Sequence, residues 1–423
     1  TALWPAEAHA MPVVLPFIGG VISALGAPAL GGLVAGSMIG SSAFISGFAA
    51  AWGLGGAALG GALLNAGLSI GISLLAEMLR PKPNVPNPGA RLVNMRQSIT
   101  FFEHAYGVVR KGGPVAFWKA KDGKRYYNVL LAARQIKGIK QWHADEREFT
   151  IDGTGLAQED EFKSKGSSRL RVSFHDGRPG QVAPPLLTAN FAQVTAAHNF
   201  DGLAHAVAVA ENCRSDDFSS VFPTSREPVI APVIEGYLCY DPRDPAQNAT
   251  DPNSWKFTSN AALIIADWIV SKDGLGKRGN WAKVAIEADE SDKIILDRNG
   301  NPVKKWQLGG SYASADEREN IRAQMGVACD AFFYEDADGF VGFNVGRWIE
   351  PDVEIVDDDI ITATFTEGQA GTDVKNAFSV EYTDPIIAYR ENASAPYVID
   401  APNEPYEEDS ISAYWIPNHN QAV

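Results

Sequence analysis

A long run without formal charge near the N-terminus constrains this chain more than any other feature. No Asp, Glu, Lys or Arg occurs from Ala8 to Ala76, a span of 69 residues in a chain of 423 whose net charge is −15. A helix that crosses a bilayer needs roughly 20 apolar residues, so the run has the length of about two or three such helices. It does not have the pattern of a secretory signal, because it is too long and no basic region precedes it.

Small residues recur within this run at intervals of four, namely at Gly32, Gly36 and Gly40, at Gly56 and Gly60, and at Gly67 and Gly71. This spacing puts small side chains on one face of a helix and lets helix backbones approach closely, as in packed membrane helices. We therefore expect residues 1–80 to be a hydrophobic, Gly/Ala-rich helical segment that can enter a membrane. Burial inside a protein assembly and plain disorder stay open as alternatives. Residues 81–90 contain four prolines and predict a stiff linker.

Charge is unevenly distributed along the rest of the chain. Residues 91–140 contain eleven Lys or Arg against two acidic residues, and residues 351–423 contain fifteen Asp or Glu against two basic residues. So concentrated a basic block needs acidic partners, and we expect these in the segment 351–423 or in a neighbouring protein. The alternative is a solvated hairpin for four of its residues, Lys119, Lys121, Lys124 and Arg125.

Beyond residue 90 the sequence alternates short apolar runs with turn signals. Asp122-Gly123 lies between the runs VAFW and YYNVLL and predicts a β-hairpin. Similar turn residues occur in HDGRPG (175–180), LDRNGNP (296–302) and EDADGF (335–340). These patterns predict a β-rich α+β fold of several small domains, with barrel-like or sandwich-like sheets and a few helices.

Three segments have helical patterns. Residues 260–271 carry an apolar stripe after Ser259, which we expect to be the N-cap. Residues 314–335 open with Ser314 and Glu317, the spacing of a capping box. Residues 280–293 are the third predicted helix.

The sequence contains none of the common catalytic or cofactor-binding motifs. We find no HExxH, GxSxG, Walker loop or GxGxxG, and the acidic turns lack the full calcium loop with its final Glu. The three cysteines, Cys213, Cys239 and Cys329, are widely spaced and predict buried reduced thiols. We expect no catalytic site, no cofactor and no dedicated metal site.

Several motifs occur in one order along the chain. The first lies in AYGVVRKGGP and comprises Tyr106, Gly107, Arg110, Gly112 and Gly113. The second lies in IEGYLCYDPRD and comprises Gly236, Tyr240, Asp241, Pro242 and Arg243. NAALIIADWIVSKDGLG and FFYEDADGFVGFNVGRW follow. Together they resemble the central tail hub, or host-specificity protein, of long-tailed, lambda-like phages, over roughly residues 91–384.

The N-terminal run has a counterpart of its own. It resembles the hydrophobic part of the lambda-like tail assembly protein, with matches at Met78, Leu79, Pro81 and Pro83. In lambda-like systems that part belongs to a separate protein, whereas here it precedes the hub-like sequence. Family members usually continue into fibronectin-like and receptor-binding regions, so receptor recognition is not carried over.

The resemblance implies a structural, non-enzymatic virion protein at the distal end of the tail. It would be a homotrimer that closes the tail tube, contacts the distal tail and tail-tip ring proteins, anchors the tape measure protein and the tail fibres, and opens for DNA ejection. The N-terminal segment would enter the host membrane, and DNA would pass without sequence-specific binding along an acidic path. A membrane-anchored pore-forming protein and a cell-wall hydrolase remain alternatives.

The expected organisation has five parts: the hydrophobic segment 1–80, the linker 81–90, a first β-rich region 91–258, a second α+β region 259–384, and an acidic C-terminal extension 385–423.

Overall fold

The computed structural model describes most of the chain beyond residue 90. The described residues are 91–96, 100–297, 300–336, 338–351, 354, 356, 359–362, 375–399 and 406–423. The charge-free run, the linker and the spaced glycines (Gly32, Gly36, Gly40, Gly56, Gly60, Gly67 and Gly71) lie outside them, so the expectations for these residues stay predictions. The described residues fall within one compact unit, Asn84–Val423. Many short strands and a few helices confirm the predicted β-rich α+β fold.

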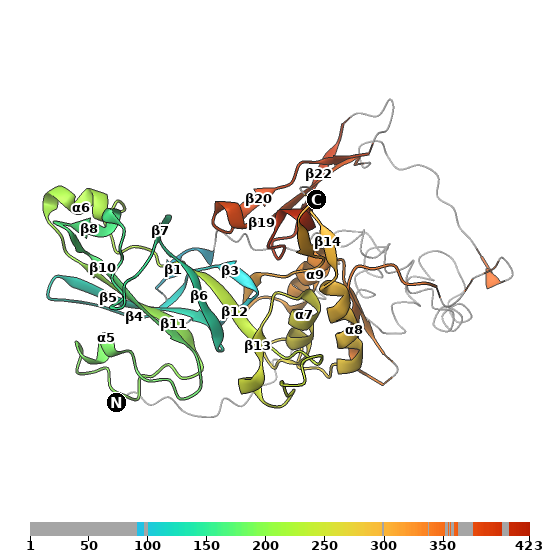
Figure 1. Cartoon of the computed structure of the whole chain (residues 1–423), viewed down its shortest axis with the longest axis horizontal. Helices are drawn as coiled ribbons and strands as arrows, with labels where there is room; N and C mark the ends of the chain where they lie inside the picture. The colour runs from blue at the N-terminus through green and yellow to red at the C-terminus, as the bar shows by residue number, and fades with distance from the viewer. Residues whose placement is uncertain are drawn as a thin grey trace, which may run out of the picture. The chain divides into compact units, whose positions relative to one another are not determined.

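A five-stranded sheet is formed by early parts of the described chain (Figure 1). In spatial order its strands are β1 (Asn94–Met95), β4 (Gly113–Lys121), β5 (Lys124–Ala132), β11 (Ala204–Glu211) and β10 (Leu170–Asp176). β4 and β5 form the predicted hairpin, with Asp122 and Gly123 at its tip. Their φ angles are 49° and 71°, and positive φ at both central residues is what a type I′ turn requires.

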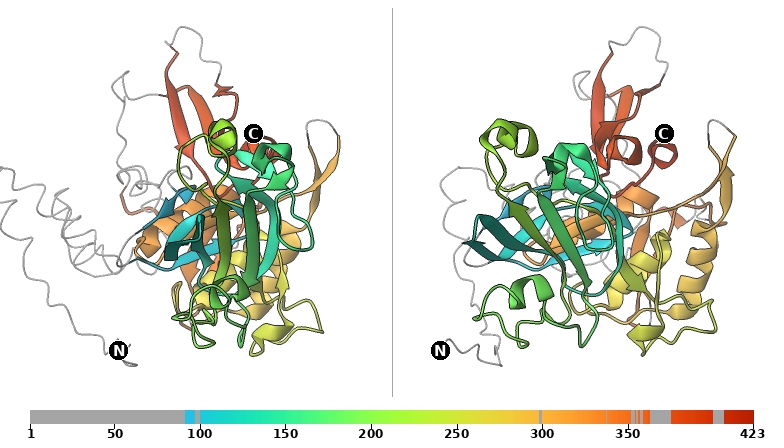
Figure 2. Two further views of the ribbon diagram at one scale, coloured as in Figure 1. Left: turned by 90° about the vertical axis from the view of Figure 1, so that its left-hand side faces the viewer. Right: turned by 60° about the vertical axis from the view of Figure 1, so that its left-hand side comes forward.

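Both faces of this sheet are covered. β11 reads AHAVAVAE, so its small and large side chains alternate between the two faces. Ala206 and Ala208 pack into the main core, whereas Val207 and Val209 pack into a second cluster with Leu187 of the short helix α5 (Pro185–Thr188). Figure 2 shows the green strands of this sheet lying side by side.

A second sheet supplies the other wall of the core. Its strands are β13 (Lys256–Phe257), β12 (Val233–Cys239), β6 (Ile136–Ala144) and β7 (Arg147–Phe149), with β3 (Val108–Arg110) also paired to β12. Side chains from both sheets, such as Val129, Leu131, Ile136 and Ile234, are fully or almost fully buried in one cluster.

Three helices follow, α7 (Ala261–Val270), α8 (Trp281–Ser291) and α9 (Arg318–Cys329). All three were predicted, but two of the expected caps are wrong. The N-cap of α7 is Asn260, whose side chain accepts a hydrogen bond from the Leu263 amide. α9 begins after Glu317 without a side-chain cap, and Ser314 instead lies 2.9 Å from Nε2 of His104. The third helix is capped by Asn280.

Two of the predicted turns connect hairpins. β14 (Ile294–Leu296) pairs with β15 (Pro302–Lys304), and β17 (Phe332–Glu335) pairs with β18 (Val341–Asn344). Residues 332–335 are therefore strand, where a continuing helix was expected. The turn at 175–180 does not join a hairpin, because it leads from β10 toward α5.

Pairing between distant segments joins early and late parts of the chain. β2 (Glu103–Tyr106) pairs with β16 (Gly310–Ala313). This pairing crosses the predicted boundary between 91–258 and 259–384, and that division stays a prediction. The C-terminal sheet contains β19 (Ala377–Asp384), β20 (Arg390–Ala393), β21 (Tyr397–Val398) and β22 (Glu408–Ser412), and α10 (His419–Ala422) follows it. The remaining elements are η3 (Asp160–Phe162), β8 (Lys163–Ser164), β9 (Ser167–Ser168), α6 (Ser215–Val221), η4 (Pro252–Ser254) and η6 (Pro385–Ile387).

All three cysteines are free, as expected from their spacing. Cys239 and Cys329 are buried, and Cys213 is half-buried. Burial raises the pKa of the Cys239 thiol well above its usual value, which makes this thiol a poor nucleophile.

Candidate functional site: a buried network around the motif residues

Tyr106 of the first motif lies in a buried polar network. Its hydroxyl donates to Oδ2 of Asp267 at 2.6 Å, and Arg134 donates to the same oxygen at 2.5 Å. The guanidinium of Arg134 also lies 4.1 Å from the centre of the Tyr237 ring. Burial, reinforced by the charge of Asp267, raises the pKa of Tyr106 well above its usual value, so this tyrosine stays a hydrogen-bond donor.

His104 extends the network toward the surface. Its Nδ1 lies 3.0 Å from the hydroxyl of Tyr237, and its ring stacks on Tyr312 with centroids 4.6 Å apart. Burial is the main cause that lowers the pKa of His104 to about 4, so the ring is neutral near pH 7. A neutral imidazole suits a structural hydrogen-bond link between β2, β12 and the residue after β16.

The motif glycines lie where backbones cross closely. Gly107 has φ of 58°, and a β-carbon there would lie 1.9 Å from the carbonyl oxygen of Leu308. A β-carbon on Gly236 would lie 2.5 Å from the carbonyl oxygen of Ala105. The Gly236 amide donates to the Gly107 carbonyl at 2.7 Å, which joins the two motifs directly. Only glycine permits such approach without displacing the neighbouring strand.

Gly112 and Gly113 serve the same purpose between β3 and β4. A β-carbon on Gly112 would lie 2.6 Å from the carbonyl oxygen of Val93, and one on Gly113 would lie 1.8 Å from that of Leu130. These residues therefore fix the approach of β1 and β5 to the start of β4.

Arg110 connects three segments of the chain. It is 3% exposed, and it donates to the carbonyls of Ala231 and Asp145 at 3.2 and 2.9 Å. Its guanidinium also lies 3.1 Å from Glu146, which pairs in turn with Arg390 of β20. Burial is the main cause that lowers the pKa of Arg110, although Glu146 opposes it. Arg110 thus ties β3 to β12 and, through Glu146, to the C-terminal sheet.

The second motif forms a separate contact with α8. Asp241 accepts hydrogen bonds from the backbone amide and from Nε of Arg243, at 3.0 and 2.9 Å. Arg243 also donates to Asp289 and Asp292 of α8, each at 2.9 Å. Its bond to Asp241 is the largest of the effects that raise its pKa. Pro242 lies between these two partners in the turn.

Tyr240 packs edge-on against Trp281 at the start of α8, with ring centroids 4.9 Å apart. Tyr106, Gly107 and Gly236 therefore meet at one strand crossing, whereas residues 240–243 anchor α8. Arg134, Asp267 and Tyr237, which link the first group, were not identified from the sequence. The one available signal was the charged Asp267 inside the apolar helix AALIIADWIV.

Several cations of the basic block, residues 91–140, form ion pairs with acids in the first 350 residues of the same chain. Lys111 pairs with Glu103, Arg91 with Asp316, and Arg134 with Asp267. On the hairpin, Lys124 pairs with Glu211 and Arg125 pairs with Glu227. Arg96, which follows β1, also pairs with Glu227. Within the described ranges no cation of this block pairs with an acid beyond residue 350, and a contact of the block with a neighbouring protein stays a prediction. Lys124 and Arg125 are not simply solvated either, because they hold the hairpin to neighbouring acids.

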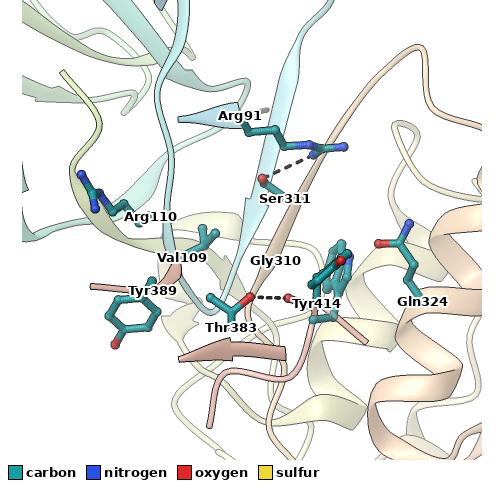
Figure 3. Close-up of a pocket in the computed structure, with 10 residues that line it drawn as sticks. Arg91, Val109, Arg110, Gly310, Ser311, Gln324, Thr383, Tyr389 and Tyr414 are labelled. Carbon is teal, nitrogen blue, oxygen red and sulfur yellow. Dashed lines mark hydrogen bonds between the residues drawn. The ribbon is translucent and has the colours of Figure 1, made fainter. Parts of the chain in front are cut away.

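A small cavity lies between Arg110, β16 and the C-terminal segment (Figure 3). It measures about 30 Å³, and its lining includes Arg91, Ser311, Thr383 and Tyr414. Arg91 donates to the Ser311 hydroxyl at 3.3 Å, and Thr383 donates to the carbonyl of Tyr414 at 2.8 Å. A cavity of this size holds about one water molecule, so it offers no room for a substrate.

A larger hollow of about 290 Å³ lies between the β4–β5 hairpin and the segment around α6. Its lining includes Phe218, Phe222, Lys124, Arg125 and Arg226. No three His, Cys, Asp or Glu side chains converge to hold a metal ion in the part of the chain that the structure describes. Among those same residues, no helix has both the length and the apolar character needed to cross a bilayer.

Comparison with known proteins gives a structural likeness but no sequence match. No protein-family model matches the sequence, and no curated protein sequence matches it. The fold is similar to that of a chain in the virion of a native gene transfer agent particle, with a TM-score of 0.50 and 13% sequence identity. The match covers 85% of this chain and 82% of that chain. The two proteins therefore share an overall fold across most of their length.

Proposed function

We propose that this protein is a structural component of a phage-like virion. The observation that carries the proposal is the fold shared with a chain of the gene transfer agent virion over 85% of this sequence. The motif residues agree with a structural role, because Tyr106, Gly107, Arg110 and Arg243 fix strand crossings and tie elements together. No enzymatic step is proposed.

Within the virion we propose the role of central hub at the distal end of the tail. The sequence motifs in hub-like order support this finer assignment. In this role three copies would close the tail tube, contact the distal tail and tail-tip ring proteins, and hold the tape measure protein and the fibres. The hub would open for ejection and let DNA pass without reading its sequence.

A membrane-anchored pore-forming protein is the second candidate. The observation that favours it is the run of 69 residues without formal charge. The two functions differ in where the protein occurs before it meets a cell. A hub is built into a particle, whereas a pore former is free or membrane-bound.

Immunogold labelling of purified particles tests the proposal. Antibodies against an exposed segment such as the loop that contains Val182, which is 70% exposed, should label one end of the tail, and particles made without this chain should lack a closed tip. Label on the capsid would contradict the hub assignment but keep the virion assignment. Absence of the chain from washed particles, with recovery in membranes, would favour the pore former.

A further inference from the structure

The β14–β15 hairpin exposes three consecutive apolar residues. Ile294, Ile295 and Leu296 are 62%, 38% and 70% exposed. Among the described residues β14 pairs only with β15, so its other edge has no strand beside it. In both views of Figure 2 the light-orange hairpin projects from the body as a two-stranded arm. An exposed apolar strand edge promotes association with other chains unless something covers it.

The C-terminal sheet has a short edge of similar apolar character. Tyr397, Val398 and Ile399 are 74%, 50% and 50% exposed. β21 pairs only with β19 among the described residues. The outer edge of β21 therefore offers backbone donors and acceptors beside three large side chains.

The two segments carry opposite charge. Residues 293–304 contain three basic residues and one acidic residue, and residues 390–412 contain six acidic residues and one basic residue. Lys293 and Lys304 remain 64% and 50% exposed although each has an acidic neighbour in its own chain. Complementary charge favours contact between the two segments over contact of either segment with itself.

We propose that the β14 edge of one copy adds to the β21 edge of a second copy of this chain. Main-chain hydrogen bonds would extend the C-terminal sheet. Ile294 and Leu296 would pack on one face beside Tyr397 and Ile399, and Ile295 would pack on the other face beside Val398. Because two different surfaces meet, the contact is heterologous and repeats from copy to copy until a ring closes. This deepens the proposed hub, which needs several copies around the tail axis, by naming the surfaces that join them.

The test uses the full chain in a mild detergent, with mass measured by sedimentation. Leu296→Asp disables the hairpin edge, and Val398→Asp disables the sheet edge. Val182→Asp, at a loop residue that is 70% exposed, is the matched control. We expect oligomers from the wild type and the control, and at least about tenfold weaker association for either edge variant. Circular dichroism checks that each variant is folded, and the milder Leu296→Asn or Val398→Asn replaces the aspartate variant at the same position if that variant does not fold.

Mixing the two edge variants separates this contact from others. Each mixed pair retains one intact hairpin edge and one intact sheet edge on different chains, so a 1:1 mixture should form heterodimers and no larger species. A monomeric wild type, assembly unchanged in both variants, or folded variants that fail to combine would each overturn the proposal. None of these outcomes bears on where the protein lies in the particle, which the labelling experiment decides separately.

Discussion

At Gly107 the backbone leaves no room for a β-carbon. Its φ of 58° disfavours any residue with a side chain, and a β-carbon added there would lie only 1.9 Å from the carbonyl oxygen of Leu308. We expect Gly107→Ala to lower the free energy of unfolding by about 3 kcal/mol or more, because strain and a backbone clash add. Urea unfolding measures this loss. Gly153→Ala is the control, since no atom lies within 4 Å of its β-carbon position, and it should change stability by under about 0.5 kcal/mol.

Two substitutions in the Tyr106–Asp267–Arg134 network should lower the stability of the fold by different amounts. Tyr106→Phe removes one hydrogen bond to Asp267 and should cost about 1–2 kcal/mol. Asp267→Ala leaves the largely buried Arg134 without its carboxylate and should cost more, about 3–5 kcal/mol. Thermal and urea unfolding of both variants would show the order. Equal losses would mean that Arg134 finds another partner.

Buried histidines predict a loss of stability in acid. Burial lowers the pKa of His205 to about 3 and those of His104 and His143 to about 4, against 6.5 in the unfolded chain. Because these pKa values are lower in the folded chain, folding keeps the three histidines neutral. Their full contribution to the free energy of unfolding is present above pH 6.5 and is lost as the pH falls toward 4. Each histidine should remove up to about 1.4 kcal/mol per pH unit in that range. His205→Asn, which can keep a donor toward Oδ1 of Asn128, should flatten the profile of unfolding free energy against pH.

Single elements were predictable where their signals are local. The β4–β5 hairpin follows from Asp122-Gly123, and α8 follows from its apolar spacing. The cap of α7 was misplaced by one residue because Ser259 and Asn260 are both good caps, and packing decides between them. The network of Tyr106, Arg134 and Asp267 could not be predicted, because Arg134 and Asp267 are 133 positions apart and only the fold brings them together.

The charge-free element stays a prediction with its own test. We expect a peptide of residues 12–80 to bind liposomes, because exposure of so long an uncharged run in water leaves a large apolar surface. Flotation with labelled vesicles measures binding. Gly36→Leu or Gly60→Leu should weaken helix packing in the bilayer if small residues make that contact. A peptide that stays monomeric, disordered and free of vesicles would rule out the membrane role.

On the scale of the whole molecule, the net charge of −15 leads us to predict that the chain does not bind DNA. Lys and Arg in a bore would hold phosphates and slow ejection, whereas an acidic bore lets the strand slide. We expect the purified chain to show no measurable affinity for duplex DNA near 0.15 M salt, in a fluorescence anisotropy titration. Binding that weakens steeply with salt would instead indicate that exposed cations such as Lys119, Lys121 and Arg125 hold DNA, because Arg110 and Lys111 are buried.

The partnership of β2 with β16 has a consequence for how the protein is made. Glu103 of β2 pairs with Ala313 of β16, and Gly310 lies so close under Trp415 that a β-carbon would meet its ring at 2.4 Å. During synthesis β2 therefore has no partner strand until roughly 200 further residues have been made, which takes about 10–40 s at 5–20 residues per second. The Trp415 ring, which covers this pairing, is synthesised roughly 100 residues after β16. A nascent chain thus holds β2 without its partner strand until β16 has been made, so a chaperone that shields β2 would act before assembly can begin.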